Sequence, residues 1–247
     1  MENKENFEGD IKIKSPLMEK IDNFWYHYKW HTIAGVFAVI VIIVLLFQTC
    51  SKVSYDGYIL YAGPYKISSS SQNGNSSPHY NAITSLKKVC EDENNDKNVN
   101  VALLNLYIST QAEAKKLYGD EADINNSMTL IQEDTERLGQ MLLYGDYYVC
   151  FLSERLFLQY EKDFEGALFS NVSGYLGSGD YELASEHGVY LRSLDFYSLP
   201  EICNLPDDTV VCLRKNSDVS SFLNKAESEK NFKISGKIFK NILNYTK

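Results

Sequence analysis

The stretch TLIQEDTERLGQMLLYGDYYVCFLSERLFLQYEK, residues 129–162, holds a helix pattern, a strand pattern and a second helix pattern in direct succession. Apolar residues recur at helical spacing up to Gly145, and a glycine commonly ends a helix. A capping box of Thr129 and Gln132 predicts where this helix begins. The segment 146–152 is short and almost wholly apolar, as in a strand buried on both faces. The order predicts an α/β fold.

The same alternation of strands and helices extends toward the amino terminus. Residues 54–65 predict a strand, and residues 98–109 predict a strand buried at the centre of the sheet. Helices are predicted over residues 77–90 and 110–119, each opening on a Ser or Thr cap. Strands that alternate with helices across short connections imply parallel pairing with right-handed crossovers.

After residue 163 the pattern becomes irregular and rich in glycine. A hairpin is predicted around HGVYLRSLDF, residues 187–196, and a strand over residues 208–216. Two helices follow this strand, the second from Lys237. We therefore expect residues 53–247 to form one α/β domain with a mainly parallel sheet.

A long apolar run, IAGVFAVIVIIVLLF, occupies residues 33–47 and lies within an uncharged span over residues 30–50. About 20 residues of α-helix cross the hydrocarbon core of a bilayer, so the span predicts one transmembrane helix. A cleaved signal peptide fits less well, because LLFQTCSK offers no Ala-x-Ala site. A lipoprotein signal ending at Cys50 fits less well too, because Gln48 and Thr49 are not small.

The stretch DNFWYHYKWHTIAG, residues 22–35, leads into this span and is rich in aromatic residues. Tryptophan and tyrosine collect at the membrane–water interface, and lysine extends its charged end to the same level. The predicted interface anchor consists of Trp25, Tyr26, Tyr28, Lys29 and Trp30.

Two histidines in the same stretch, His27 and His31, have the spacing of a zinc or haem contact. Two ligands are too few for such a site, so no metal site is predicted. Upstream, Leu17, Ile21 and Phe24 recur at helical spacing behind a Ser-Pro start. We expect residues 1–29 to be a cytoplasmic segment with a short amphipathic helix on the membrane surface.

The distribution of charged residues predicts the orientation of the chain in the membrane and the class of partner. Five lysines precede the span, four of them between residues 12 and 29, and Lys52 and Lys66 follow it; this bias favours a cytoplasmic amino terminus and an extracellular carboxy-terminal domain. The six Lys+Arg and six Asp+Glu before residue 53 cancel, so the whole net charge of −9 lies in residues 53–247. An acidic domain argues against nucleic acid as a partner, since nucleic acid requires a basic surface.

The five cysteines are odd in number and widely spaced, unlike a disulfide framework or a zinc site. Cys150 and Cys212 lie inside apolar runs, where a free cysteine acts as a small core residue. A disulfide between Cys203 and Cys212 is the alternative that an extracellular location leaves open.

Two segments resemble a known family. TERLGQMLLYGDYYVCFLSERLF, residues 135–157, resembles the helix–Gly-Asp–strand segment of extracellular solute-binding proteins of the periplasmic-binding-protein-like type 2 group. DDTVVCLRKNSDVSSFLNKAE, residues 207–227, resembles their later strand, turn and helix. The whole chain resembles single-pass membrane proteins of low-GC Gram-positive bacteria that carry a DNFWYHYKWHTI anchor. The resemblance implies a truncated binding-protein-like domain, since about 195 residues leave little room for a second lobe.

For catalysis the domain offers His79 and His187, with no G-x-S-x-G, H-E-x-x-H or Walker sequence beside them. We expect no enzymatic activity and no cofactor, but a membrane-anchored extracytoplasmic binding or sensing module in the cell membrane. Its partners would be the lipid bilayer and a small polar ligand or peptide. The alternative is a structural or partner-binding subunit of a cell-envelope complex, and an envelope hydrolase is less favoured.

The position of a ligand site follows from the predicted sheet. In open α/β sheets, ligands collect at the carboxyl ends of parallel strands. These ends lead here into loops 62–75, 109–111 and 153–155. The predicted ligand-binding residues are Tyr65, Ser109, Thr110, Ser153 and Arg155. The competing interpretation is that these are ordinary cap and turn residues.

Overall fold

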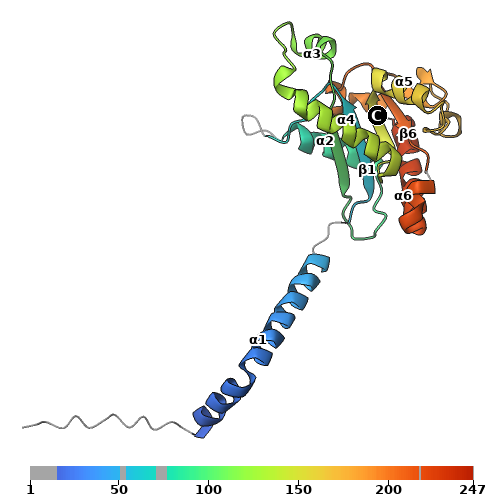
Figure 1. Ribbon diagram of the computed structural model, residues 1–247. Helices are drawn as coiled ribbons and strands as arrows, with labels where there is room; N and C mark the ends of the chain where they lie inside the picture. The colour runs from blue at the N-terminus through green and yellow to red at the C-terminus, as the bar shows by residue number, and fades with distance from the viewer. Residues whose placement is uncertain (1–15, 51–53, 71–76, 217, 247) are drawn as a thin grey trace, which may run out of the picture. The chain divides into compact units, whose positions relative to one another are not determined.

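The computed structural model describes residues 16–50, 54–70, 77–216 and 218–246 (Figure 1). The chain divides into two units, Met1–Val53 and Ser54–Lys247, close to the predicted domain start at residue 53. The first unit contains a single described helix. The second contains the whole sheet and the hydrophobic core.

The first unit is built on α1, a helix over Pro16–Cys50 that begins at the predicted proline. Its segment Phe24–Leu46 is long and apolar enough to cross a membrane, and none of it is buried in the protein. This candidate span starts six residues before the predicted one. The helix covers residues 16–29 of the predicted cytoplasmic segment, and residues 1–15 lie outside the described part of the chain. The side chains of Leu17 and Ile21 also lie outside it, and Phe24 is 54% exposed.

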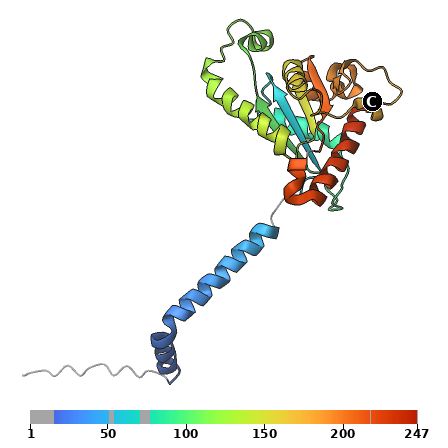
Figure 2. The ribbon, with the colours of Figure 1, turned by 45° about the vertical axis from the view of Figure 1, so that its right-hand side comes forward.

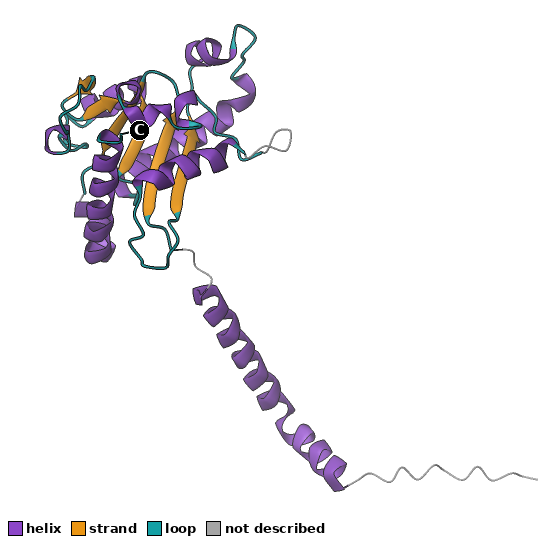
Figure 3. Ribbon diagram, turned by 180° about the vertical axis from the view of Figure 1, so that it is seen from behind, coloured by secondary structure: helices purple, strands orange, loops and turns teal. Residues whose placement is uncertain are grey.

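The second unit is organised around one six-stranded sheet of mixed direction (Figure 3). Its strand order is β2-β1-β3-β6-β5-β4. The strands span Gly57–Gly63 (β1), Val101–Tyr107 (β2), Val149–Ser153 (β3), Leu183–Ser185 (β4), Gly188–Tyr190 (β5) and Thr209–Leu213 (β6).

The prediction of a mainly parallel sheet is correct for half of the sheet and wrong for the rest. β1 pairs with β2 and with β3 in parallel, whereas β3–β6, β6–β5 and β5–β4 are antiparallel. A parallel strand requires a crossover that returns the chain to the starting edge. The connection between β3 and β6 has α5 (Glu154–Asp163) and then only 3₁₀ turns and the β4–β5 hairpin. This hairpin spans residues 183–190 and not the predicted 187–196, because residues 191–193 and 195–198 form 3₁₀ turns. The chain forms the β4–β5 hairpin and then enters β6, so β6 pairs antiparallel with β3 and with β5.

β2 was predicted at the centre of the sheet, but it lies at the edge. It is apolar because it is covered on both faces, by α4 (Met128–Tyr144) on one and α2 (Pro78–Leu86) on the other. The buried carboxylate of Asp134 on α4 accepts a hydrogen bond from the Tyr107 N–H at 2.7 Å. That bond occupies a backbone donor, which limits pairing with another strand.

Side chains alternate strictly between the two faces of the central strands. Leu60, Cys150 and Leu152 point toward α4 and α5, whereas Ile59 and Phe151 point toward α2 and α6 (Asp218–Leu243). Figure 2 shows the sheet between α4 and α6. Both faces are buried, which explains why the central strands read as continuous apolar runs.

The helix ends correct one prediction and confirm another. α3 (Gln111–Tyr118) ends at Gly119, whose φ of 89° suits glycine, as predicted. α4 begins at Met128, directly after a 3₁₀ turn, so the predicted capping box of Thr129 and Gln132 does not form. The preceding turn already carries the chain into the helix, which places Thr129 inside it.

The carboxy-terminal helices differ in number from the prediction. A single helix, α6, covers the region where two were expected, and it includes the predicted start at Lys237. Its later turns bury Ile238, Phe239 and Ile242 in the core. The side chains of residues 218–224 lie outside the described part of the chain.

Cys150 and Cys212 are buried free thiols, as predicted, and they face each other across the β3–β6 ladder. Cys212 has no exposed surface, whereas Cys203 is exposed and free. The alternative disulfide between Cys203 and Cys212 is therefore wrong. Burial raises the pKa of the Cys212 thiol well above its ordinary value, so this thiol stays protonated.

Candidate functional site

The strand order β2-β1-β3 places a topological switch point between β1 and β3, because the chain leaves β1 on one side and β3 lies on the other. Crevices form outside the carboxyl ends of strands at such points. Three elements meet at this edge here: the turn after Gly63, the junction of β3 with α5 at Ser153, and the loop that enters β6 at Thr209. We call this edge the switch-point edge.

A cavity of about 280 Å³ opens at the switch-point edge. The turn after β1, the helix α3 and the loop before β6 line it. Its wall combines apolar surface with carboxylates and one lysine. The lining residues are Pro64, Glu113, Lys116, Leu117, Tyr197, Cys203, Asn204, Leu205, Pro206, Asp207 and Asp208.

Two predicted ligand residues, Ser109 and Thr110, use their side chains to start α3. Thr110 accepts a hydrogen bond from the Glu113 N–H, and the Glu113 carboxylate accepts one from the Thr110 N–H at 2.7 Å. This is a complete capping box. Ser109 donates its hydroxyl to the Thr110 carbonyl at 3.0 Å. The structure gives both residues a local structural role.

Arg155 and Tyr65, which were also predicted, contact carboxylates at this edge. The Arg155 Nε lies 3.0 Å from Glu113 Oε1, and the Tyr65 hydroxyl donates to Glu201 Oε1 at 2.8 Å. Burial alone would raise the pKa of Glu113. The hydrogen bonds from Arg155 and Thr110 outweigh that effect, so the Glu113 pKa lies below its ordinary value.

Tyrosines donate hydrogen bonds to further carboxylates at this edge. Tyr197 donates to Asp207 at 2.9 Å, and Tyr190 donates to Glu154 at 2.5 Å. Burial, together with the bond to Asp207, raises the Tyr197 pKa to about 12. The bond to Glu154 raises the Tyr190 pKa to about 12. These hydroxyls therefore remain donors at physiological pH, and they do not supply a base.

Three buried polar atoms at the switch-point edge have no hydrogen-bond partner: Ser153 Oγ, Asp208 Oδ1 and Thr209 Oγ1. Ser153 is 2% exposed and Thr209 is 1% exposed. The two residues are directly opposite in the β3–β6 ladder, and Asp208 precedes Thr209 and lines the cavity. A buried oxygen without a donor costs free energy. Of the three residues, Asp208 lines the cavity and brings this group of unbonded oxygens to the cavity wall.

Of these three residues, the sequence singled out only Ser153. The dipeptide Asp207-Asp208 reads as a turn, and Thr209 reads as the first residue of a strand. Their proximity to Ser153 depends on the antiparallel pairing of β6 with β3, which no local pattern announces.

His187 does not form a nucleophilic arrangement with Ser185. His187 Nδ1 lies 2.5 Å from Glu161 Oε1, and the Ser185 hydroxyl donates to the same oxygen at 2.9 Å. The carboxylate thus stands between the serine and the imidazole. A serine nucleophile needs the imidazole as its own partner, so this order does not activate Ser185.

Among the described residues, no three His, Cys, Asp or Glu side chains group closely enough to hold a metal ion. The acidic run after α2 folds upon itself. Asp92 Oδ2 accepts from the Lys97 N–H and Asp96 Oδ1 from the Asn98 N–H, both at 2.8 Å. Such bonds define turns in which a short carboxylate replaces a backbone acceptor.

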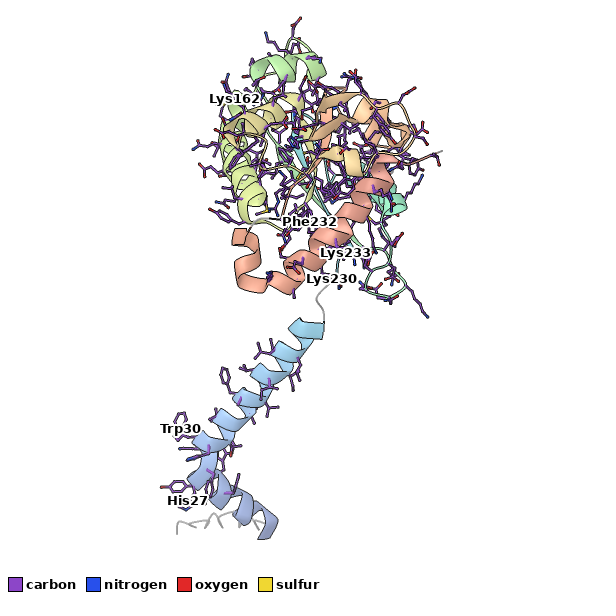
Figure 4. The ribbon with its side chains drawn as sticks, turned by 90° about the vertical axis from the view of Figure 1, so that its right-hand side faces the viewer. His27, Trp30, Lys162, Lys230, Phe232 and Lys233 are labelled. Atoms are coloured by element: carbon purple, nitrogen blue, oxygen red, sulfur yellow. The ribbon has the colours of Figure 1, made fainter. Side chains whose placement is uncertain are left out.

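The predicted interface residues lie on the first two turns of the candidate span in α1. Figure 4 shows the Trp30 side chain projecting from the helix. Trp30 and Tyr26 are 73% and 75% exposed. Phe24 and Tyr28 stack at 5.2 Å between ring centroids, one helical turn apart. Aromatic rings without protein cover fit the headgroup level of a bilayer.

Comparisons of this chain with protein-family models, with curated proteins and with solved structures gave no match. The resemblance to solute-binding proteins therefore remains a prediction, and the functional argument stands on the geometry described above.

Proposed function

We propose that this protein is a membrane-anchored binding module, without catalytic activity, that holds a small polar ligand at the switch-point edge. α1 serves as the single membrane anchor, with the amino terminus in the cytoplasm. The Ser54–Lys247 unit lies outside the cell and presents the cavity beside Asp208. The module recognises its ligand mainly through hydrogen bonds.

The observation that carries this proposal is the contrast among carboxylates at one edge. Glu113 is bonded to Arg155, and Asp207 is bonded to Tyr197. Asp208 Oδ1 is buried and has no donor, and Asp208 precedes Thr209, whose hydroxyl is also unpartnered. Polar atoms that a fold leaves buried and unbonded are rare, and each calls for an explanation such as a bound molecule.

The cavity size supports a small ligand rather than a folded partner. A volume of about 280 Å³ lies near the lower end of the range for small-molecule sites, about 300–1,000 Å³. Pro64, Leu117 and Leu205 supply apolar surface around the polar atoms. A ligand with a few donors and a small apolar part fits this wall.

A thermal-shift screen of the full chain in phosphatidylcholine nanodiscs tests the proposal. The library consists of amino acids, sugars and short peptides, and unfolding is followed by near-ultraviolet circular dichroism. We expect at least one compound to raise Tm by several degrees. Ser153→Ala and Thr209→Val should remove that shift, because each deletes one of the hydroxyls proposed to contact the ligand.

The unliganded variants supply the discriminating control. Because Ser153 Oγ and Thr209 Oγ1 have no partner, removing them should leave the unliganded Tm unchanged or higher. Thr135→Ala, which deletes an α4 hydroxyl bonded only to the Ile131 carbonyl, should keep the full ligand shift. A ligand whose shift survives both site variants would place its binding elsewhere.

Cysteine labelling in intact cells tests the orientation. In a background without native cysteines, Ser69→Cys should react with a membrane-impermeant maleimide, and Lys4→Cys should not. The expectation rests on the lysine bias around the span. The reverse labelling pattern would show that the unit faces the cytoplasm.

A further inference from the structure

The edge of the sheet opposite the switch-point edge contains a buried cation without a counter-ion. Arg214 follows β6 and has no exposed surface. Its Nη2 donates to the Gly145 carbonyl, and its Nε donates to the Tyr147 carbonyl at 3.4 Å. Nη1 has no hydrogen-bond partner. Among the described residues, no carboxylate forms an ion pair with this guanidinium.

The surroundings of Arg214 compensate its positive charge and its hydrogen-bond donors only in part. Its guanidinium carbon lies 4.3 Å from the centroid of the Tyr148 ring, a cation–π contact. Burial lowers the pKa of the guanidinium, although arginine remains charged in proteins. An uncompensated charge inside a protein is costly, and an unpaired donor adds to that cost.

Arg214 also lines a cavity of about 310 Å³ between the end of α4, the end of α5 and the segment after β6. Leu142, Phe164 and Leu168 form an apolar wall, and Lys215 adds a second cation. The lining contains no acidic residue, although the protein as a whole carries a net charge of −9. The cavity therefore combines local positive charge with hydrocarbon surface.

We infer that this cavity binds a small carboxylate that carries a hydrocarbon chain, with its carboxylate at Arg214 and Lys215. A carboxylate matches the planar donor fork of a guanidinium and would supply the acceptor that Nη1 lacks. The chain would lie against Leu142 and Leu168. A purely structural role for Arg214, holding the α4 end through Gly145, explains the two bonded nitrogens but leaves Nη1 and the cavity unexplained.

This site is independent of the switch-point edge. It lies at the end of β6, whereas Thr209 begins that strand. Ligand binding at this site is therefore measured with variants that leave Ser153 and Asp208 intact. The proposal for either site can be refuted while the other stands.

Sodium hexanoate is the probe, at 10 mM with the full chain in phosphatidylcholine nanodiscs. We expect hexanoate to raise Tm by about 3 °C, the size of shift that modest binding gives a unit of this length. Three controls are used at the same concentration. Hexan-1-ol has the hydrocarbon chain without a charge, and hexylammonium chloride has the same chain with a positive charge. Inorganic phosphate has negative charge without a hydrocarbon chain. Each should shift Tm by less than about 1 °C.

Variants separate recognition from folding. Lys215→Gln should reduce the hexanoate shift to less than half. Ala167→Trp, at an exposed position of the cavity wall, should abolish it while both cations remain. Arg214→Gln should abolish it as well, and if that variant does not fold, the other two decide. Lys233→Gln, on the exposed side of α6 in Figure 4, is the matched control and should keep the full shift.

The inference is wrong if hexan-1-ol, hexylammonium or phosphate matches hexanoate. It is equally wrong if hexanoate gives no shift, or if Lys215→Gln and Ala167→Trp both keep the full shift.

Discussion

The apolar run of α1, residues 33–47, and the central strands of the sheet are both rich in apolar residues, yet their side chains have opposite surroundings. Phe37 and Ile40 on α1 are 67% and 52% exposed, whereas Phe157 and Leu152 in the second unit have no exposed surface. Both segments are continuous apolar runs. One of them is covered by helices on two faces, and the other has no protein cover within its unit.

The difference shows that an apolar segment needs to be shielded from water, but its composition does not say whether protein or lipid shields it. The strands bury their residues against α4, α5 and α6, which supply matching apolar faces. Within its own unit, α1 has no such partner among the described residues, and its backbone bonds are satisfied within the helix. A helix of this kind is suited to lipid, where water does not compete for backbone groups.

Phe157→Ala should have the largest effect on the stability of the second unit. Phe157 packs on Phe169, with 5.3 Å between their ring centroids, and its ring lies against Gly188. Truncation leaves a cavity, so unfolding of the unit by urea should become easier by about 3–5 kcal/mol. Phe37→Ala on α1 should leave this unfolding free energy unchanged. Equal effects of the two variants would remove the contrast between the regions.

Ile40→Arg should affect membrane integration and spare the fold of the second unit. A central arginine costs a transmembrane helix about 3 kcal/mol. We expect a large part of the protein to leave the carbonate-resistant membrane fraction, with unchanged near-ultraviolet circular dichroism of the unit. Unchanged membrane association would mean that α1 is not the anchor.

Cys150→Ser should destabilise the second unit by about 1–3 kcal/mol, because a hydroxyl would replace a thiol in a dry layer. Cys212→Ser should act similarly, since the two residues are cross-strand neighbours. Urea unfolding measures both, and the exposed Cys203→Ser is the control without effect. Fast modification of Cys150 by a bulky thiol reagent in the native protein would contradict its placement.

Thr110→Ala should destabilise the unit by about 1 kcal/mol through loss of the α3 capping box. Thr110→Ser keeps the capping oxygen and should restore most of the stability. If instead Thr110→Ala leaves stability unchanged but removes a ligand shift, Thr110 acts in binding and not in capping.

The Arg155–Glu113 pair should give the smallest effect, and one that depends on pH. The Glu113 pKa is lowered in the folded state from an ordinary value of 4.5. The stabilisation is therefore present above that ordinary value and is lost as pH falls through the lower, folded pKa. Arg155→Met should cost less than about 1 kcal/mol near neutral pH, since the arginine is well exposed. The cost should vanish in acid, as followed by urea unfolding at several pH values.

Local sequence patterns predicted some residues of the candidate sites and not others. Ser153 was predicted because it follows an apolar strand, and the structure places it at the switch-point edge. Asp208 and Thr209 join it only through the antiparallel entry of β6. Arg214 gave no signal at all, because a single arginine after a strand reads as a surface residue until packing encloses it.

Periodicity by itself determined α1, the order of strands and helices up to α5, the end of α3 at Gly119 and the buried state of Cys150 and Cys212. These features depend on neighbours within a few residues or on apolar content, which a sequence records directly. Only the tertiary structure decided that β2 lies at the edge and that β6 runs antiparallel. Strand order and direction depend on how a chain returns to the sheet, and residues far apart in sequence settle that by the surfaces they can bury together.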